Sequence, residues 1–328
     1  MARILAVRRE TYPIRGSFRI SRGAKTEAAV VVAEIRDGDA AGHGECVPYA
    51  RYGETVEGVT AAIEAQAGAV ARGLDRAALL SAMPAGAARN ALDAALWDIE
   101  AKQTGVPAWK RAGLAQPPRP ATTLFTIGID EPAAMEAAAR AAHDRPLLKV
   151  KLGDDRLIER MRAVRAGAPR ARLLIDFNEG ADWQALLAAG PELAAMGVEM
   201  IEQPLPAGQD ARLAGLGYPI PFGADESVHG TDDLAPLRGR YRYVNIKLDK
   251  TGGLTAALAM KERARQAGFG IMIGCMVGSS LAMAPALLLA QDADFVDLDG
   301  PLLLARDREP ALRYDGAIIQ PAEARLWG

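Results

Sequence analysis

The feature that most constrains the fold of this chain is a series of short apolar runs, each of which ends in a polar or ionisable residue. Five of these ends are Lys151, Asp176, Glu202, Asp225 and Lys247. Successive ends lie 22 to 26 residues apart, about the length that a strand, a turn, a helix and a return loop need. We count eight such runs between residues 123 and 299, the number of strands that closes a (β/α) barrel.

The placement of the ionisable residues predicts where such a barrel would carry its chemistry. In (β/α) barrels the active site lies at the C-terminal ends of the strands. The ionisable residues of this chain fall at those ends, where a structural salt bridge would have no reason to recur in phase with the strands. We therefore expect an active site at the C-terminal mouth of the barrel.

The first part of the chain lacks this rhythm and predicts an α+β domain. Alternating and helical patterns predict an antiparallel meander followed by two helices, over residues 3–13, 28–35, 42–45, 56–70 and 87–102. A proline-rich stretch at 116–120 reads as a linker. We expect a capping domain over 1–115, a barrel over 116–302, and a tail over 303–328 that packs back on the first domain.

Composition excludes several functional classes. The net charge of −2 gives no field that would attract nucleic acid or an anionic membrane. No apolar run approaches the length of a transmembrane span or forms a secretory signal, so we expect a cytoplasmic protein. Two cysteines provide no disulfide framework, and three histidines show no zinc-ligand spacing. Assembly into a homo-oligomer is left open.

Two lysines spaced i, i+2 are the first candidate catalytic feature. On a strand, Lys149 and Lys151 would project from one face while Leu148 and Val150 pack on the other. Repulsion between the two ammonium groups would lower the pKa of at least one of them, toward a range of roughly 7–8 that suits proton transfer. The alternative is an edge strand with a solvated charged face.

Three acids at consecutive strand ends predict a metal site. Without a cation, Asp176, Glu202 and Asp225 would repel each other strongly. Oxygen ligands alone select a hard divalent ion, and they favour Mg²⁺. Asn178 would support these ligands from behind. The alternative is a salt-bridge cluster of the acids with the strand lysines, which would bury many charges without function.

The strand lysines then indicate a reaction. In an eight-stranded barrel Lys151 and Lys247 would face each other across the metal, and Lys149 would lie close to a bound carboxylate. One base on each face of an α-carbon allows a proton to leave from one side and return on the other, through an enediolate that the cation stabilises. This is racemisation or epimerisation. We expect Lys250, beyond the strand end, to be a surface residue.

Two further motifs bear on the substrate. Asp297 and Asp299 repeat the i, i+2 spacing and would bind an ammonium group, so a molecule with both a carboxylate and an ammonium, such as a dipeptide, fits. The alternative is a helix cap and a turn acid. Glycines at 16 and 23 flank a segment that interrupts the meander and would form a mobile lid carrying Arg22, or a solvated basic hairpin loop.

The motifs resemble those of the enolase superfamily, muconate-lactonising-enzyme subgroup. The resemblance rests on Lys149-Val150-Lys151, Asp176-Phe177-Asn178, Glu202-Gln203-Pro204, Ala224-Asp225-Glu226-Ser227 and Asn245-Ile246-Lys247. Asp297-Leu298-Asp299 resembles the dipeptide epimerases. Within these, the chain is similar to the bacterial L-Ala-D/L-Glu epimerases through residues 44–49, 51–54, 84–91, 247–253 and 274–276.

The resemblance implies a (β/α)₇β barrel, with a capping domain built from the N-terminal region and the C-terminal tail. It implies Mg²⁺ on the three acids, acid/base roles for Lys151 and Lys247, and ammonium capture by Asp297 and Asp299. Other positions match substrate contacts in the relatives, namely Thr126, Lys149, Cys275 and Val277. Arg22 matches the loop arginine that pairs with a glutamate side chain.

These observations predict a Mg²⁺-dependent dipeptide epimerase that inverts the C-terminal residue, with L-Ala-D-Glu and L-Ala-L-Glu as its pair of substrates in murein peptide recycling. Alternatives within the superfamily are another dipeptide specificity, or a muconate cycloisomerase or o-succinylbenzoate synthase type of lyase. A catalytically silent ligand-binding barrel is the non-enzymatic alternative. A Schiff-base aldolase using Lys247 would leave the three carboxylates unexplained.

Overall fold

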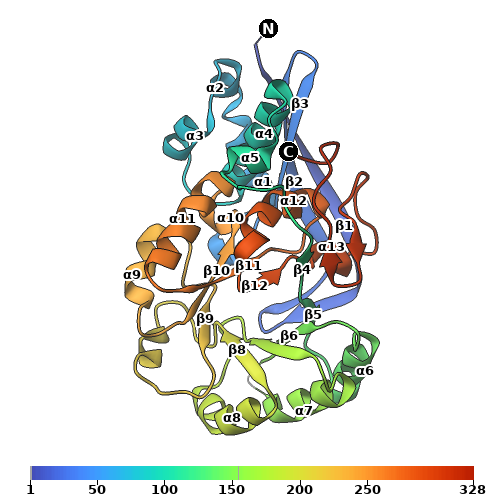
Figure 1. The fold of residues 1–328 in the computed structure, drawn as a ribbon, viewed down its shortest axis with the longest axis vertical. Helices are drawn as coiled ribbons and strands as arrows, with labels where there is room; N and C mark the ends of the chain where they lie inside the picture. The colour runs from blue at the N-terminus through green and yellow to red at the C-terminus, as the bar shows by residue number, and fades with distance from the viewer. Residues whose placement is uncertain (1, 154) are drawn as a thin grey trace.

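The structure, a computed structural model, describes residues 2–153 and 155–328. Its larger part is an eight-stranded parallel sheet whose strands follow each other in chain order (Figure 1). The strands are β5 (Phe125–Ile127), β6 (Leu147–Lys151), β7 (Arg172–Asp176), β8 (Val198–Glu202), β9 (Phe222–Ala224), β10 (Tyr243–Lys247), β11 (Gly270–Gly274) and β12 (Phe295–Asp297). Leu124 N donates to Val296 O at 2.9 Å and joins the two ends of the sheet. The predicted barrel is confirmed.

Helices follow most of the strands on the outside of the barrel. They are α6 (Pro132–Ala141), α7 (Leu157–Gly167), α8 (Trp183–Ala195), α9 (Leu234–Leu237), α10 (Leu248–Thr251), α11 (Leu254–Gln266), α12 (Ser280–Leu289) and α13 (Gly300–Leu303). Residues 203–221, all of them described, form only the 3-10 helix η2 (Asp210–Leu213) between β8 and β9. Four prolines and three glycines in this segment disfavour a longer helix.

The interior of the barrel has an apolar floor and a charged upper layer. Side chains of Leu124, Leu147, Leu174, Met200, Met272 and Phe295 form the floor. Side chains alternate along a strand, so Lys149 and Lys151 share the inward face of β6 with Leu147, one step and two steps further toward the mouth. Leu148 and Val150 face the outer helices instead. Strand register therefore brings the ionisable side chains into the layers directly above the floor.

The N-terminal part is an antiparallel sheet covered by helices. The sheet runs in the order β1 (Ile4–Ile20), β2 (Gly23–Asp37) and β3 (Ala40–Cys46). Helices α1 (Val56–Glu64), α2 (Ala67–Ala71), α3 (Arg76–Ala82), α4 (Ala87–Thr104) and α5 (Ala108–Arg111) follow, after the 3-10 helix η1 (Ala50–Tyr52). The approach of α4 to β3 requires Gly44, because a Cβ there would lie 2.1 Å from Ala91 O.

Two local expectations for this part were wrong, and one helix was not predicted. Residues 16–23 do not interrupt the meander, because β1 and β2 continue as one long hairpin with a single register shift between Pro13 and Phe18. The predicted helix 56–70 ends at Glu64 and restarts at Ala67. Helix α3 was not predicted. In Figure 1 the blue hairpin reaches from the top of the molecule down to the barrel, beside β5 and β6.

The C-terminal tail touches both parts of the chain. Its strands β13 (Tyr314–Asp315) and β14 (Ile318–Ile319) extend to β4 (Ala121–Thr122) as a small antiparallel sheet. Trp327 Nε1 donates to Ala94 O of α4 at 2.9 Å, and Ala305 N donates to Pro13 O of β1 at 2.7 Å. The exact domain boundaries stay a prediction. Among the residues that the structure describes, no helix has the length and apolar character needed to cross a membrane.

Candidate active site

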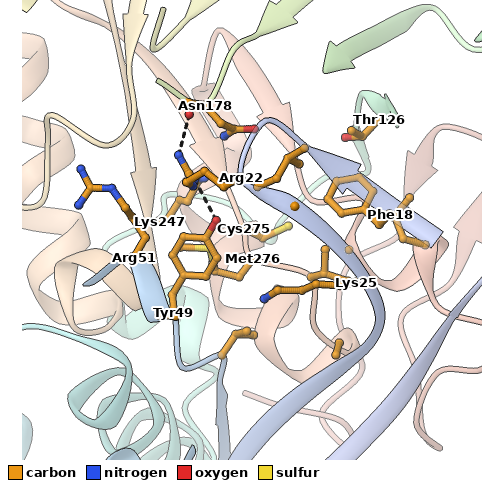
Figure 2. Close-up of a pocket in the computed structure, with 18 of the residues that line it drawn as sticks. Phe18, Arg22, Lys25, Tyr49, Arg51, Thr126, Asn178, Lys247, Cys275 and Met276 are labelled. Atoms are coloured by element: carbon orange, nitrogen blue, oxygen red, sulfur yellow. Dashed lines mark hydrogen bonds between the residues drawn. The ribbon is translucent and has the colours of Figure 1, made fainter. Parts of the chain in front are cut away.

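A cavity of about 640 Å³ lies between the mouth of the barrel and the tip of the β1–β2 hairpin. All the predicted site residues line it except Asp176 and Glu202, whose side chains are completely buried. Figure 2 shows Arg22 and Lys25 of the hairpin together with Thr126 and Lys247 of the barrel among the residues that line this cavity. The structure therefore brings the sequence-predicted residues together at one place.

Lys151 and Lys247 reach the cavity from opposite sides of the barrel. They lie at the ends of β6 and β10, and three strands separate β6 from β10 in either direction around the barrel. Lys151 Nζ donates to Asp176 Oδ2 at 2.5 Å and to Asn178 Oδ1 at 3.0 Å. Lys247 Nζ donates to Asp225 Oδ2 at 2.6 Å. Each amine is thus held in a fixed direction by a buried acceptor while it lines the cavity.

Lys149 lies deeper and is surrounded by carboxylates. Its Nζ is 3.1 Å from Asp176 Oδ2, 2.7 Å from Glu202 Oε2 and 2.7 Å from Asp297 Oδ2. Burial by itself would lower the pKa of Lys149, but these three acids hold it well above the ordinary value. The expectation that the neighbouring ammonium group would lower the pKa is wrong for Lys149, because the acids outnumber the lysines around it.

The three acids that we predicted as metal ligands are buried and electrostatically coupled. Asp176 and Glu202 are partners in the register of β7 and β8. Burial and the charge of Asp176 raise the pKa of Glu202 to about 7. Burial opposes ionisation of Asp225 as well, but Lys247 and Lys250 hold its pKa well below the ordinary value. The acids therefore depend on nearby positive charge to stay ionised.

In the structure this charge comes from lysines. The described residues contain no group of three or more His, Cys, Asp and Glu side chains already arranged to hold a metal ion. Lys149 Nζ instead contacts both Asp176 and Glu202. The salt-bridge pairing considered as an alternative is therefore present. The donor set still fits a hard cation: three carboxylates follow consecutive strands, and Glu202 Oε2 accepts no hydrogen bond within the described chain despite its contact with Lys149.

Lys250 is not the surface residue that we expected. It is 2% exposed, and its Nζ donates to Asp225 Oδ1 and Asp225 O at 2.6 Å and to Asn245 O at 2.9 Å. Burial lowers its pKa, against the attraction of Asp225. The short helix α10 begins directly after β10 and turns this side chain back under the strand ends. Lys250 thereby holds both the backbone carbonyl and the carboxylate of Asp225.

Asp297 and Asp299 have different partners although both line the cavity. Asp297 Oδ2 accepts a hydrogen bond from Lys149 Nζ at 2.7 Å, whereas Asp299 Oδ2 accepts one from the backbone N–H of Thr126 at 2.7 Å. Burial and the charge of Asp297 raise the pKa of Asp299 to about 7. Asp299 does occupy the N-cap position of α13, as the alternative predicted, but its side chain makes no capping hydrogen bond there. Asp299 is the acid without a cationic partner in the described part of the chain.

Arg22 lies at the hairpin tip and is held by protein groups. It donates to Asn178 O at 2.8 Å and to the Tyr49 hydroxyl at 2.9 Å (Figure 2). Its guanidinium also pairs with Glu226 at 2.8 Å and with Glu179 at 3.2 Å. These contacts connect the tip of the hairpin to the ends of β7 and β9.

Lys25 is a cavity-lining residue that the sequence analysis missed. It follows the hairpin turn on β2, and its Nζ lies 5.3 Å from the centre of the Tyr49 ring. No carboxylate pairs with Lys25 among the residues that the structure describes. Strand alternation beyond Gly23 could have pointed to it, had the segment been recognised as a continuous hairpin.

Comparison with known proteins identifies relatives of both parts of the chain. The family described as "Mandelate racemase / muconate lactonizing enzyme, N-terminal domain" matches residues 2–113, and "Enolase C-terminal domain-like" matches residues 133–299. An L-Ala-D/L-Glu epimerase of Escherichia coli is 44% identical, covering 95% of this chain and 98% of its own. An N-acetyl-D-glutamate racemase of a Pseudoalteromonas species is 45% identical, covering 91% and 95%.

Solved structures agree with this. An enolase family member from Agrobacterium tumefaciens, described as homologous to dipeptide epimerases and solved with sodium and L-Ala-L-Glu, superposes with a TM-score of 0.98. It is 54% identical, and the match covers 99% of this chain and 100% of that one. Other similar dipeptide epimerases were solved with Mg and a dipeptide.

Proposed function

Since the chain belongs to the mandelate racemase / muconate lactonizing enzyme family of the enolase superfamily, we propose that it is a Mg²⁺-dependent dipeptide epimerase that inverts the α-carbon of the C-terminal residue. The observation that carries the proposal is the placement of Lys151 and Lys247 on opposite sides of one cavity. An amine on each face of a carbon is what a proton transfer with inversion requires.

The two lysines would divide the proton transfer between them. The amine that faces the substrate proton accepts it in its neutral form, and the opposite ammonium donates a proton to the other face of the carbon. Asp176 and Asn178 orient Lys151, and Asp225 orients Lys247. Because the lysines lie on different strands, each side of the planar intermediate has its own proton carrier, and either epimer of the dipeptide serves as substrate.

Asp176, Glu202 and Asp225 would hold the divalent cation, with Asn178 and Asn245 supporting the first two. Asn178 Nδ2 lies 3.3 Å from Asp176 Oδ2, and Asn245 Nδ2 donates to Glu202 Oε1 at 2.6 Å. When bound, Mg²⁺ supplies positive charge that stabilises the enediolate formed as the α-proton leaves.

The substrate we favour is L-Ala-D-Glu or L-Ala-L-Glu. Asp299, which faces the cavity without a cationic partner in the described residues, would receive the ammonium group of the N-terminal residue. Lys25 would pair with the side-chain carboxylate, because Arg22 already has four protein partners. Cys275, Val277 and Thr126 would line the rest of the peptide. We place the activity in the cytoplasm, in the recycling of murein peptides.

A second candidate is the racemisation of N-acetyl-glutamate, which the 45% identity to an N-acetyl-D-glutamate racemase favours. This compound has an acetyl group in place of the alanyl group, so it lacks both the ammonium group and a methyl group and makes no use of Asp299. The uncompensated acid in the cavity therefore favours the dipeptide.

Solvent-exchange measurements decide between these functions. Incubation in D₂O with Mg²⁺ should place deuterium on the α-carbon of the glutamyl residue of L-Ala-D-Glu and convert it to L-Ala-L-Glu. Asp299→Asn should reduce this turnover and leave any activity on N-acetyl-D-glutamate unchanged. Deuterium in N-acetyl-D-glutamate alone would establish the second candidate, and none in either would contradict both. Dipeptide activity unaffected by Asp297→Asn or Asp299→Asn would favour a cycloisomerase-type lyase.

A further inference from the structure

Two adjacent serines at the start of α12 are each held by a carboxylate from outside the barrel. Ser279 donates its backbone N–H to Glu45 Oε1 at 2.7 Å and its hydroxyl to Glu45 Oε2. Ser280 donates its N–H to Asp307 Oδ1 at 3.0 Å and its hydroxyl to Asp307 Oδ2. Glu45 lies on β3 of the N-terminal sheet, and Asp307 lies in the C-terminal tail. One helix start is therefore attached to two separate segments.

The Glu45 contact lies where the β11–α12 loop leaves the cavity. Residues 275–277 of this loop line the cavity, and Gly278 and Ser279 follow directly. Gly278 lies so close to the N-terminal sheet that a Cβ there would be 3.1 Å from Glu45 Oε1 and 3.0 Å from Val47 Cγ2. The distance of the loop from this sheet is thus set by direct contact.

The opposite side of the same loop packs against the turn that follows Asp299. A Cβ on Gly300 would lie 3.1 Å from Met276 O and 3.2 Å from Gly278 N. The loop is therefore enclosed between the N-terminal sheet and the turn that carries Asp299. A shift of the loop would move one wall of the cavity and disturb that turn as well.

The polar groups at this contact are removed from water. Glu45 is 1% exposed and Ser279 is fully buried. Arg308 of the tail donates to Ser279 Oγ at 2.8 Å and lies 3.6 Å from Glu45, so it supplies the balancing charge. Removing the carboxylate would leave the N–H and the hydroxyl of Ser279 without acceptors, and the loop would have to move to reach others.

We propose that Glu45 is a positioning residue for substrate binding, because by holding Ser279 it fixes residues 275–277 as a wall of the substrate cavity. The consequence of this role for catalysis rests on the proposed function. Asp307 holds Ser280, which already belongs to the helix, and so it fixes α12 rather than the loop. Through Glu45, the N-terminal sheet thereby determines the shape of a loop that belongs to the barrel.

Glu45→Ala and Glu45→Gln separate positioning from general stability. With L-Ala-D-Glu, Glu45→Ala should raise KM about tenfold, since small displacements of a binding wall cost this much, and keep kcat within about twofold, because Lys151 and Lys247 lie on other strands. Glu45→Gln keeps an acceptor for the N–H of Ser279 and loses only the acceptor for its hydroxyl, so its KM should lie between those of the unmodified protein and Glu45→Ala. An unchanged KM in Glu45→Ala, or a fall in kcat alone, would overturn the proposal.

The adjacent serines provide a matched pair that perturbs the fold less. Ser279→Ala should raise KM, whereas Ser280→Ala should lower the melting temperature without changing KM. Hydrogen exchange gives a readout that needs no substrate: the amides of residues 275–279 should exchange faster in Glu45→Ala and Ser279→Ala than in Ser280→Ala. Equal exchange in all variants refutes the positioning role. Absence of epimerisation in the unmodified protein would instead refute the proposed function and leave the exchange experiment valid.

Discussion

Lys151 and Lys247 reach one cavity from opposite sides of the barrel, and each donates its amine to a different buried carboxylate, at 2.5 Å to Asp176 and at 2.6 Å to Asp225. The strands that carry them, β6 and β10, are separated by three strands in either direction around the barrel. A carbon held between the two amines presents a different face to each. This relationship is what the proposed inversion requires, and the first prediction tests it.

Replacing either lysine should stop epimerisation and leave one-sided exchange. In Lys151→Ala, Lys247 can still remove a proton from its own face, so deuterium should enter one enantiomer of the glutamyl residue and not the other. Lys247→Ala should show the opposite preference. Epimerisation should fall by a factor of at least about 10²–10⁴, the usual contribution of a general acid or base. Chiral analysis of the exchanged product measures this, and full epimerisation in either variant would contradict the two-base scheme.

Mg²⁺ should stabilise the protein through Glu202. A ligand that binds only the folded state at about 100 times its Kd adds about 2.7 kcal/mol to the free energy of unfolding. We therefore expect the melting temperature to rise on titration with Mg²⁺ and to return with EDTA, together with loss of activity. Glu202→Gln should abolish the shift. Glu199→Gln is the control, because Glu199 lies on the same strand but pairs with Arg172 outside the barrel. An equal shift in both variants would place the ion elsewhere.

Lys25 should determine the preference for an acidic side chain. Lys25→Met removes the cation that we assign to the side-chain carboxylate, so kcat/KM for L-Ala-D-Glu should fall by about 10- to 100-fold, as expected for a hydrogen bond between charged groups. With L-Ala-D-Met, which has no charge to pair, the same variant should stay within about threefold. Lys25→Arg should behave like the unmodified protein. Parallel losses for both substrates would mean that Lys25 supports the cavity rather than recognising charge.

Stability should decrease as pH rises, in part because of Glu45. Burial raises the pKa of Glu45 from 4.5 to about 7, so the folded protein binds this proton more tightly than the unfolded chain. Its contribution is complete below about pH 4.5 and is lost as pH rises toward 7, by up to about 3 kcal/mol. Glu45→Gln cannot titrate and should show a shallower decline between pH 5 and 8 in urea unfolding. Parallel curves for the two proteins would show that Glu45 is ionised across this range.

The barrel could be predicted from the sequence because its signal is local and repeated. An apolar run that ends in Asp176 or Lys247 reports one strand and one strand end, and the repeat supplies the topology. The segment between β8 and β9 was not predicted correctly, because the spacing between these two strands is ordinary. Its prolines and glycines nevertheless leave η2 in place of the expected helix. Spacing alone does not reveal what fills the interval between strands.

The site residues that were missed or misplaced depend on contacts between distant segments. Lys250 reads as a surface residue because nothing nearby in the sequence shows that Asp225 will accept its amine. Lys25 reaches the cavity because β1 and β2 form one continuous hairpin over the barrel, and its neighbours in the sequence do not indicate this. The partners of Arg22 lie 27 to 204 residues away along the chain, at Tyr49, Asn178, Glu179 and Glu226.

The β1–β2 hairpin extends from the N-terminal sheet to the entrance of the cavity. With 17 residues at about 3.3 Å each, β1 is an arm of roughly 55 Å whose far end touches the barrel, where Ile129 N donates to Arg19 O at 3.0 Å. The same strand is also held part-way along, where Ala305 N of the tail donates to Pro13 O at 2.7 Å and Arg15 Nε donates to Leu304 O at 2.9 Å. The register of β1 against β2 shifts between Pro13 and Phe18, directly beyond the first of these contacts. A movement that opens the entrance to the cavity therefore concerns the tip beyond this shift, while the rest of the hairpin stays attached to the tail.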